Sequence, residues 1–247
     1  MTIQRFSSLF YPIFIGLLAM FSQASLAKEL LISASSSLTE PLTEISQHYE
    51  RENPGWQLRL NFAATPVLVR QIKAQSSVDV FLSAALAPVS TLVGEGMIEH
   101  QVNFASTELV LILSPKWAQA KDSIPELIKQ SSSIALCDPS VPIGDYAKQY
   151  LQKEGLWDLA VSKKVQADNV KGVVGFVERG LVDVGFVYAS DLAKKNIAMR
   201  PLPRDKAPQV QFAGGVLSKS SQKKEAIKFV QYLQTPKGRK ILEKYKL

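Results

Sequence analysis

Short apolar runs alternate with amphipathic segments along most of the chain. The runs predict strands, and apolar positions that recur every three or four residues, such as Leu38, Leu42, Ile45 and Tyr49, predict helices between them. Strands are expected over residues 29–34, 57–63, 78–82, 107–114, 133–137, 182–188 and 212–217. Helices are expected over residues 38–49, 66–74, 88–95, 124–130, 145–153 and 169–179, with two more closing the chain. This alternation predicts an α/β fold.

Polar residues gather at the turns where a predicted strand gives way to a helix. Ser37 precedes Glu40 by three residues, which is a capping-box pattern, although Pro41 would move the start of the helix one or two residues later. Thr65 and Pro66 place a hydroxyl at the N-cap and a proline at the first helical position. Taken singly, each of these turns predicts no more than a capped helix.

Taken together, the turns predict an anion site. Further turns of this kind are expected at residues 138–144 and 168–172 and after Tyr188. Open α/β sheets bind ligands at the carboxyl ends of their strands. Helix N-termini at those ends offer unpaired N–H donors and a partial positive charge, which suit an anion. The hydroxyls of Ser37, Thr65 and Tyr188 would add donors without adding charge.

The first residues predict an export signal that is not part of the fold. Arg5 supplies a positive charge, residues 9–21 are mostly apolar, and Ser25-Leu26-Ala27 places small residues at the positions that precede a cleavage site. A membrane helix needs roughly 20 apolar residues, and this run is shorter and contains Pro12. We therefore expect residues 1–27 to be a signal peptide cleaved after Ala27, and the mature chain to lie in the periplasm.

The positive charge of the chain is concentrated near its C-terminus. The chain has 29 Lys and Arg residues against 22 Asp and Glu residues, a net charge of +7, and residues 219–247 hold nine basic residues against two acidic ones. This segment could dock on an acidic partner or a membrane surface, but the solvated outer face of two helices is the favoured interpretation. No nucleic-acid-binding motif accompanies the charge, so no nucleic-acid partner is expected.

The residues used in hydrolytic or metal chemistry are scarce. The single cysteine, Cys137, stands in an apolar run and is expected to be a buried apolar residue. His48 is expected on a helix and His100 in a loop. The sequence has no HExxH motif, metal-ligand cluster, GxSxG motif or Walker A loop. An enzyme is therefore the less favoured class, and the expected protein is a binding protein.

Four stretches match a known family in order along essentially the whole mature chain: residues 31–39, residues 68–72 with 79–84, residues 138–148 and residues 185–191. The sequence resembles the periplasmic molybdate-binding proteins of ABC importers, which have the type II periplasmic binding protein fold. The resemblance implies two lobes with a ligand cleft between them. Lobe I would comprise residues 28–107 and 213–247, and lobe II residues 108–212.

The resemblance also implies how a ligand is held. In this family hydroxyls and backbone N–H groups bind the oxyanion without a positive side chain. Carried over, the hydroxyl donors are Ser37, Thr65 and Tyr188, and the backbone donors are Ile143 and Val170 with the neighbourhoods of Ser37 and Thr65. The metal atom of the oxyanion would have no direct protein ligand, and no cofactor is implied. The implied function is capture of molybdate and tungstate by a monomer that delivers them to an ABC transporter permease in the inner membrane.

The chain departs from the family pattern at three places. Ala64-Thr65-Pro66 lies where the family is commonly serine-rich, the loop at Asp138 is one residue shorter than in a well-known relative, and Ala85 takes a position that is usually aspartate. Carriers of another oxyanion, such as sulfate or phosphate, therefore stay open. An exported enzyme on the same scaffold and the sensing domain of a regulator are further alternatives, but the export signal and the missing helix-turn-helix argue against the regulator.

Three acidic residues near the turns bear on selectivity. A carboxylate in the cleft would give a protonated oxyanion such as phosphate an acceptor, whereas a site of donors alone would reject it. We expect Asp138, Asp145 and Asp168 to face away from the cleft. Asp168 is expected to cap its helix, and Asp138 precedes a proline that would turn the chain.

Overall fold

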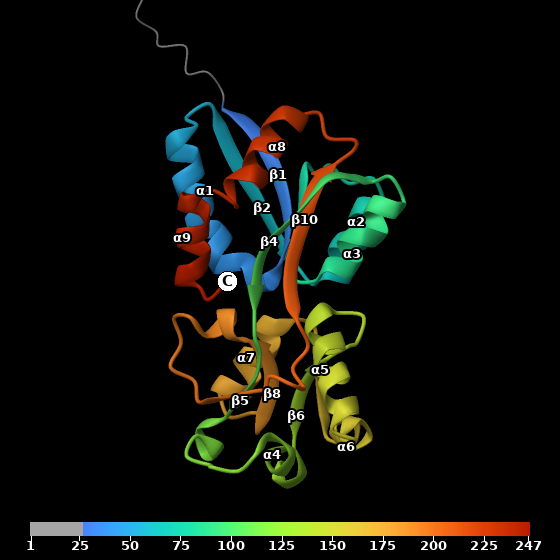
Figure 1. Ribbon diagram of the computed structural model, residues 1–247, viewed down its shortest axis with the longest axis vertical. Coiled ribbons are helices and arrows are strands. Elements are labelled where there is room, and N and C mark those ends of the chain that lie inside the picture. Colours follow the sequence, from blue (N-terminus) through green and yellow to red (C-terminus); the bar gives the residue numbers. More distant parts are fainter. Residues whose placement is uncertain (1–26) are drawn as a thin grey trace, which may run out of the picture.

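In the computed structural model, which describes residues 27–247, the chain forms two α/β lobes joined end to end (Figure 1). Each lobe is built on a five-stranded sheet. The first sheet has the order β2-β1-β3-β10-β4 and contains β1 (Lys28–Ser35), β2 (Trp56–Ala63), β3 (Val80–Ser83), β4 (Ile98–Thr107) and β10 (Val210–Leu217). The second sheet has the order β7-β6-β8-β5-β9 and contains β5 (Leu109–Leu113), β6 (Ile134–Cys137), β7 (Lys164–Ala167), β8 (Val184–Tyr188) and β9 (Met199–Pro201).

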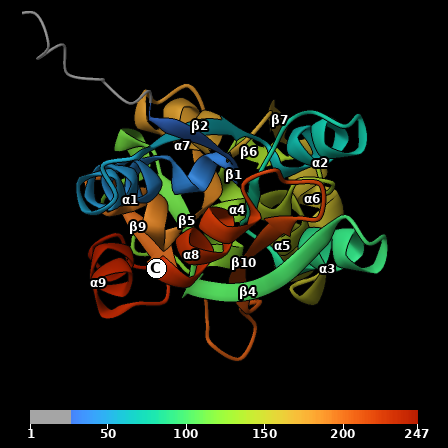
Figure 2. The same ribbon diagram turned by 90° about the horizontal axis from the view of Figure 1, so that it is seen from above.

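In the first lobe, helical crossovers link the parallel strands. β1 runs parallel to β2 and β3, and β10 runs antiparallel to β3 and β4. Seen from above, α1 and α9 lie side by side on one flank of the lobe, and α2 and α3 lie on the other (Figure 2). The helical segments of this lobe are η1 (Ser36–Leu38), α1 (Thr39–Glu52), α2 (Thr65–Lys73), α3 (Leu86–Gly94), α8 (Lys223–Tyr232) and α9 (Pro236–Lys244).

The second lobe repeats this plan. β6 runs parallel to β7 and β8, while β5 pairs antiparallel with β8 and β9. All five residues of β5 are buried, as the uninterrupted apolar run 109–113 predicts for an inner strand. The helical segments are η2 (Pro115–Trp117), α4 (Ile124–Gln130), α5 (Pro142–Lys153), α6 (Trp157–Ser162), α7 (Val170–Glu178) and η3 (Ala189–Leu192).

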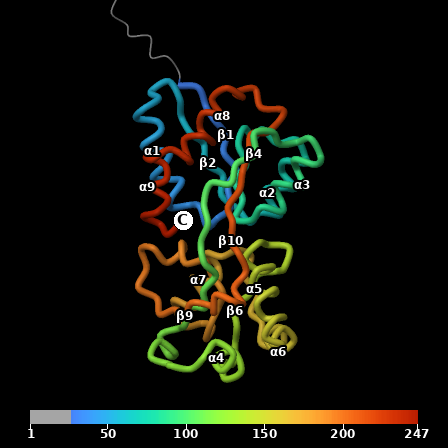
Figure 3. Tube along the Cα trace, in the orientation of Figure 1, coloured from blue at the N-terminus to red at the C-terminus, as the bar shows by residue number. Residues whose placement is uncertain are grey.

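The chain passes between the two sheets twice (Figure 3). It leaves the first sheet at the end of β4 and enters the second at β5, then returns through residues 202–209 to β10. The expected lobe limit after Thr107 falls between β4 and β5, whereas the limit after Phe212 falls inside β10, which begins at Val210. Within residues 27–247 these two crossings are the covalent links between the sheets. The exact limits of the two lobes remain predictions.

The hydrophobic pattern predicted most elements to within a few residues but missed β4, α6, β7 and β9. In β4 only Ile98 and Phe104 are buried, and its pairing with β10 has two register shifts, so no alternation appears in the sequence. His100, expected in a loop, lies in this strand with a φ of 50°. The other three elements have only six, four and three residues, too short for a recognisable period.

The basic C-terminal segment is a solvated outer face, as favoured from the sequence. All nine of its basic residues are exposed. Four of them form ion pairs with acidic side chains: Lys223 with Glu99, Lys228 with Glu225, Lys237 with Glu52 and Lys244 with Glu44. Ion pairs at the surface contribute about 0–1 kcal/mol each, and only the Lys228 pair includes a buried acid, Glu225.

A methyl group added at Gly214 tests the close approach of β10 to β3. A Cβ there would lie 2.4 Å from Leu82 Cδ2 and 2.5 Å from the carbonyl oxygen of Phe81. Because overpacking typically costs about 1–3 kcal/mol, Gly214→Ala should lower the free energy of unfolding by that amount in urea denaturation. Gly94→Ala is the matched control, since a Cβ there meets nothing within 4 Å. Equal stabilities of the two variants would contradict the close approach.

Candidate functional site

A small cavity lies where the ends of the two sheets meet. Its lining comes from residues that end or follow six strands: residues 35–37, 63–65 and 84 of the first lobe, and residues 141–143, 170 and 188 of the second. Those strands are β1, β2 and β3 in the first sheet and β6, β7 and β8 in the second. The cavity is therefore built from the carboxyl ends of parallel strands in both lobes, the usual ligand position in open α/β sheets.

All five residues singled out from the sequence line this one cavity: Ser37, Thr65, Ile143, Val170 and Tyr188. Each of them is buried. The cavity measures about 10 Å³, close to the space that one water molecule needs. The residues of the two lobes thus leave room for little more than a water molecule between them.

Ser37 contributes an unpaired hydroxyl to the lining. Its Oγ is buried and has no hydrogen-bond partner among residues 27–247. The capping box expected between Ser37 and Glu40 is wrong, because α1 begins at Thr39 and its N-cap is Leu38. The later start agrees with the effect expected of Pro41. The 3-10 turn that precedes α1 therefore leaves the Ser37 hydroxyl available to a ligand.

Tyr188 supplies a second unpaired hydroxyl from the end of β8. Its OH is buried and finds no partner in the described part of the chain. Burial raises the pKa of the phenol well above its ordinary value, so the group keeps its proton at neutral pH and can donate. The rings of Tyr146 and Phe212 stand edge-on to the Tyr188 ring, with centroids 6.3 and 5.6 Å away. An unpaired buried polar group costs about 1–3 kcal/mol, and an acceptor in the cavity would remove this cost.

Thr65 does not cap α2 as expected. The N-cap is Ala64, and Thr65 is the first residue of the helix. Its Oγ1 lies 2.7 Å from Ser35 Oγ, which in turn accepts a hydrogen bond of 3.1 Å from the backbone N–H of Ala84. Ser35 was missed from the sequence, although it stands in the same serine run as Ser37 at the end of β1.

The N-terminus of α5 presents Ile143 as its first backbone donor. The first four N–H groups of a helix lack intrahelical partners, and Pro142, the first residue of α5, has no N–H. A Cβ at Gly144 would lie 2.2 Å from the carbonyl oxygen of Asp138. Glycine at this position therefore lets the shortened loop after β6 bring the helix start against the end of the strand.

The N-terminus of α7 presents Val170 in the same way. The expectation that Asp168 caps this helix is wrong, because Asn169 is the N-cap and its Oδ1 accepts a hydrogen bond of 3.2 Å from Gly172 N–H. Asp168 is exposed instead. The residue that caps the helix next to the cavity is thus a neutral amide and not a carboxylate, which suits an anion.

No charged side chain is among the lining residues. Asp138 and Asp145 are exposed and outside the lining, as expected. The buried acid Asp191 contacts a lining residue: its Oδ2 accepts a hydrogen bond of 3.2 Å from Tyr188 N–H. Burial raises the pKa of Asp191 to about 7. Outside the lining, Lys171 of α7 and Glu40 of α1 form an ion pair that joins the two lobes.

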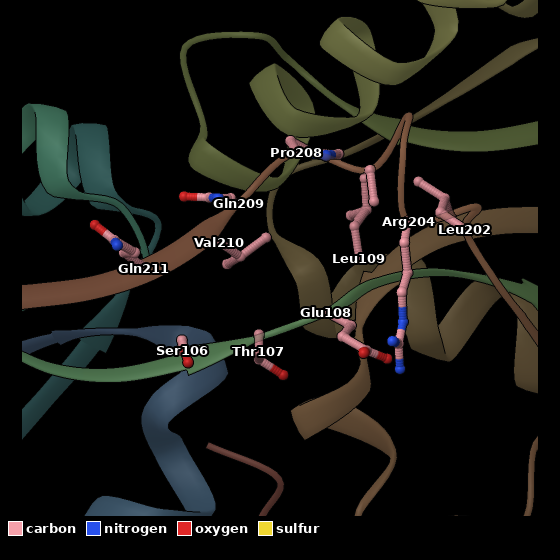
Figure 4. A pocket seen from close by; sticks show the side chains of 11 residues that line it. Ser106, Thr107, Glu108, Leu109, Leu202, Arg204, Pro208, Gln209, Val210 and Gln211 are labelled. Atoms are coloured by element: carbon pink, nitrogen blue, oxygen red, sulfur yellow. The ribbon is translucent and has the colours of Figure 1, made fainter.

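A larger hollow of about 390 Å³ lies beside the two chain crossings (Figure 4). Figure 4 shows Glu108 and Arg204 at one end of it, and Gln209 and Gln211 along the returning segment. These four side chains are exposed, and none belongs to a helix N-terminus. The hollow therefore lacks the convergent donors of the small cavity, and we assign the candidate site to the small cavity.

Metal and thiol chemistry find no support in the described residues. Within residues 27–247, no group of three or more His, Cys, Asp or Glu side chains is placed to hold a metal ion. Cys137 is buried, as expected, and burial raises the pKa of its thiol to about 12, which leaves it unreactive. His48 lies on α1 and borders a surface hollow away from the cavity.

The family model of bacterial extracellular solute-binding proteins matches residues 30–245. A putative ABC transporter substrate-binding lipoprotein of Bacillus subtilis is 32% identical, over 95% of this chain and 96% of the relative. The molybdate-binding protein ModA of Escherichia coli is 29% identical, over 88% of each chain. Among solved structures, the substrate-binding domain of a putative molybdenum ABC transporter from Clostridium difficile is 29% identical with a TM-score of 0.69, covering 88% of this chain and 97% of that one.

The fold and site define a two-lobed solute-binding protein. The chain belongs to the bacterial extracellular solute-binding protein family. None of the helices in residues 27–247 is long and apolar enough to cross a membrane. The expected signal peptide lies almost wholly in residues 1–26, outside the described residues.

Asp191→Asn should change how stability depends on pH. A carboxyl whose pKa rises from 3.8 to about 7 on folding binds its proton more tightly in the folded state, so its contribution to stability falls as pH rises through this window and is constant above it. Asn removes the titration and keeps an acceptor for Tyr188 N–H. The stability of the variant relative to wild type should therefore increase between pH 4 and 7, by up to about 1.4 kcal/mol per unit.

Urea denaturation at several pH values measures this difference. Asp168→Asn, which alters an exposed carboxyl, is the control and should give a difference that does not change with pH. A flat difference for Asp191→Asn as well would show that the Asp191 carboxyl stays ionised in the folded protein.

Proposed function

We propose that the protein captures molybdate, and tungstate with it, between its lobes and delivers the anion to the permease of an ABC importer. The observation that carries this proposal is the pair of buried, unpaired hydroxyls of Ser37 and Tyr188 in a cavity without charged side chains. The similarity to a molybdate-binding protein of Escherichia coli and to the substrate-binding domain of a putative molybdenum ABC transporter of Clostridium difficile supports the choice of anion.

The donors of the cavity suit a tetrahedral dianion. Hydroxyls come from Ser37, Thr65 and Tyr188, and the starts of α2, α5 and α7 border the cavity. Each helix N-terminus is equivalent to roughly half a positive charge. Neutral donors at fixed positions can thus stabilise a double negative charge without a lysine or arginine.

The two lobes contribute different donors, which links ligand binding to closure. Ser37 and Thr65 belong to the first lobe, and Ile143, Val170 and Tyr188 to the second. Contacts at the rim also join the lobes: Lys171 pairs with Glu40, and Lys194 Nζ donates a 2.6 Å hydrogen bond to Tyr245 OH. These contacts are partly exposed and contribute modestly, so the anion would provide the main bridge. A permease could then distinguish the loaded, closed form from the open one.

We propose transport without chemical change of the ligand. Tyr188 is the one residue of the lining with an ionisable side chain, and burial raises its pKa so that the phenol keeps its proton. The proposal therefore includes no general acid or base and no resident cofactor. It also includes export through a signal peptide removed after Ala27, with the mature monomer acting in the periplasm.

Removal of single hydroxyls tests the proposed site. Hydrogen bonds to charged partners contribute roughly 1.5–3 kcal/mol each, and 1.4 kcal/mol is a factor of ten in affinity. Ser37→Ala and Tyr188→Phe should each weaken molybdate binding about tenfold or more in titration calorimetry, while His48→Ala on α1 should bind like wild type. Molybdate at a hundred times its Kd should also stabilise the wild-type fold by about 2.7 kcal/mol. Wild-type affinity in both hydroxyl variants would refute the site, and no binding of molybdate or tungstate by the wild type would refute the function.

A further inference from the structure

A second pair of hydroxyls, those of Ser35 and Thr65, forms a series of hydrogen bonds beside the cavity, and either hydroxyl could donate to the other. Ser35 Oγ and Thr65 Oγ1 are 2.7 Å apart, and Ser35 Oγ accepts a 3.1 Å hydrogen bond from Ala84 N–H. All three residues line the cavity and are at most 4% exposed. They come from the ends of three neighbouring strands, β1, β2 and β3. This series of hydrogen bonds therefore links the ends of the three strands and lies at the site.

The protons of this series can be counted. Each hydroxyl has one proton to donate and two lone pairs that accept. Between Ser35 and Thr65 one of the two protons is used in their mutual hydrogen bond, so the pair retains a single proton for the cavity. The Ala84 N–H is also used, because it donates to Ser35. A bound anion thus gains one hydroxyl donor from the pair, supplied either by Ser35 or by Thr65.

The partners of the two oxygens favour Thr65 as the donor to the anion. Ser35 Oγ already has two partners, Ala84 N–H and Thr65, whereas the Thr65 hydroxyl has only Ser35 among the described hydrogen bonds. If Ser35 donates to Thr65, each hydroxyl accepts one hydrogen bond and donates one, and the Thr65 proton is directed to the remaining acceptor, the anion. Hydrogen bonds in such a series polarise one another, which strengthens the last donor.

Resting on the proposed function, we propose that Ser35 is a positioning residue for anion binding: it takes the Ala84 N–H and donates its own proton to Thr65, so that the Thr65 hydroxyl donates to the anion. Ser35 acts through Thr65 in this arrangement. The contribution of Ser35 to affinity should therefore depend on the presence of the Thr65 hydroxyl, which a purely structural serine would not require.

A double-mutant cycle on the full mature chain tests this, with molybdate as the probe in calorimetry. Thr65→Ala should weaken binding about tenfold or more, and Ser35→Ala by a smaller factor of roughly three to ten. The double variant should bind within about twofold of Thr65→Ala, because coupled positions are not additive. Ser46→Ala is the matched control: this buried serine of α1 donates to Thr43 O, 2.9 Å away and outside the cavity lining, and its variant should bind like wild type.

Three results would overturn the proposal. The losses of the single variants could multiply in the double variant, which would make Ser35 and Thr65 independent. Ser35→Ala could lose more affinity than Thr65→Ala, which would make Ser35 the direct donor. Ser35→Ala could also bind like wild type, which would remove any role for Ser35.

Two further measures keep the test decisive. Ser35→Thr retains a hydroxyl and should bind within about twofold of wild type, and a loss equal to that of Ser35→Ala counts against the proposal. If Ser35→Ala does not fold, Ser35→Cys, whose thiol is a weak donor, takes its place in the cycle. If the wild type does not bind molybdate, the cycle is run with tungstate or sulfate. A wild type that binds neither molybdate nor tungstate contradicts the proposed function itself, whereas the result of the cycle tests the role of Ser35 with whichever anion binds.

Discussion

The structure depends on neutral hydrogen-bond donors that are held away from water without an acceptor. The hydroxyls of Ser37 and Tyr188 are buried and unpaired within residues 27–247, a state that costs free energy in any fold. Such groups can be satisfied by an ordered water or by a ligand, and these two lie together in the lining of the cavity. The same two donors stand on opposite lobes, so one anion that accepts from both would stabilise the closed arrangement. Binding, closure and selectivity can in this way follow from a single set of contacts.

The arrangement of strands explains why the donors meet. In each sheet three parallel strands end at the junction, and the residues immediately after them line the cavity. Turns of this kind expose the first N–H groups of the following helices. Gly144 shows how tightly the backbone must approach here, since any side chain would collide with the Asp138 carbonyl oxygen. The remaining helices and the basic C-terminal face mainly complete the two cores and their solvated surfaces.

Much of this could be predicted from the sequence because strand–turn–helix patterns are local. The turns at Ser37, Ile143 and Tyr188 follow apolar runs directly, and the resemblance to a family placed them in one site. What local patterns could not provide are the contacts between distant segments. Ser35 and Thr65 are 30 residues apart, so their hydrogen bond is invisible in the sequence. The choice between Asp168 and Asn169 as a cap depends on backbone geometry at one residue, and the edge strand β4 has no regular apolar period.

A cavity lined by N–H and hydroxyl groups but by no carboxylate makes a chemical distinction among oxyanions. Phosphate keeps at least one proton near neutral pH, and a hydroxyl that accepts this proton is the only partner the lining offers, so we expect the hydrogen bonding of phosphate to be incomplete at a cost of about 1–3 kcal/mol. Molybdate, tungstate and sulfate bring no proton, and sulfate differs from the other two in size. Competition calorimetry of the wild-type protein at neutral pH measures this directly. The account predicts molybdate and tungstate together at the highest affinity, sulfate well below them and no detectable phosphate binding, and phosphate bound as tightly as molybdate would contradict it.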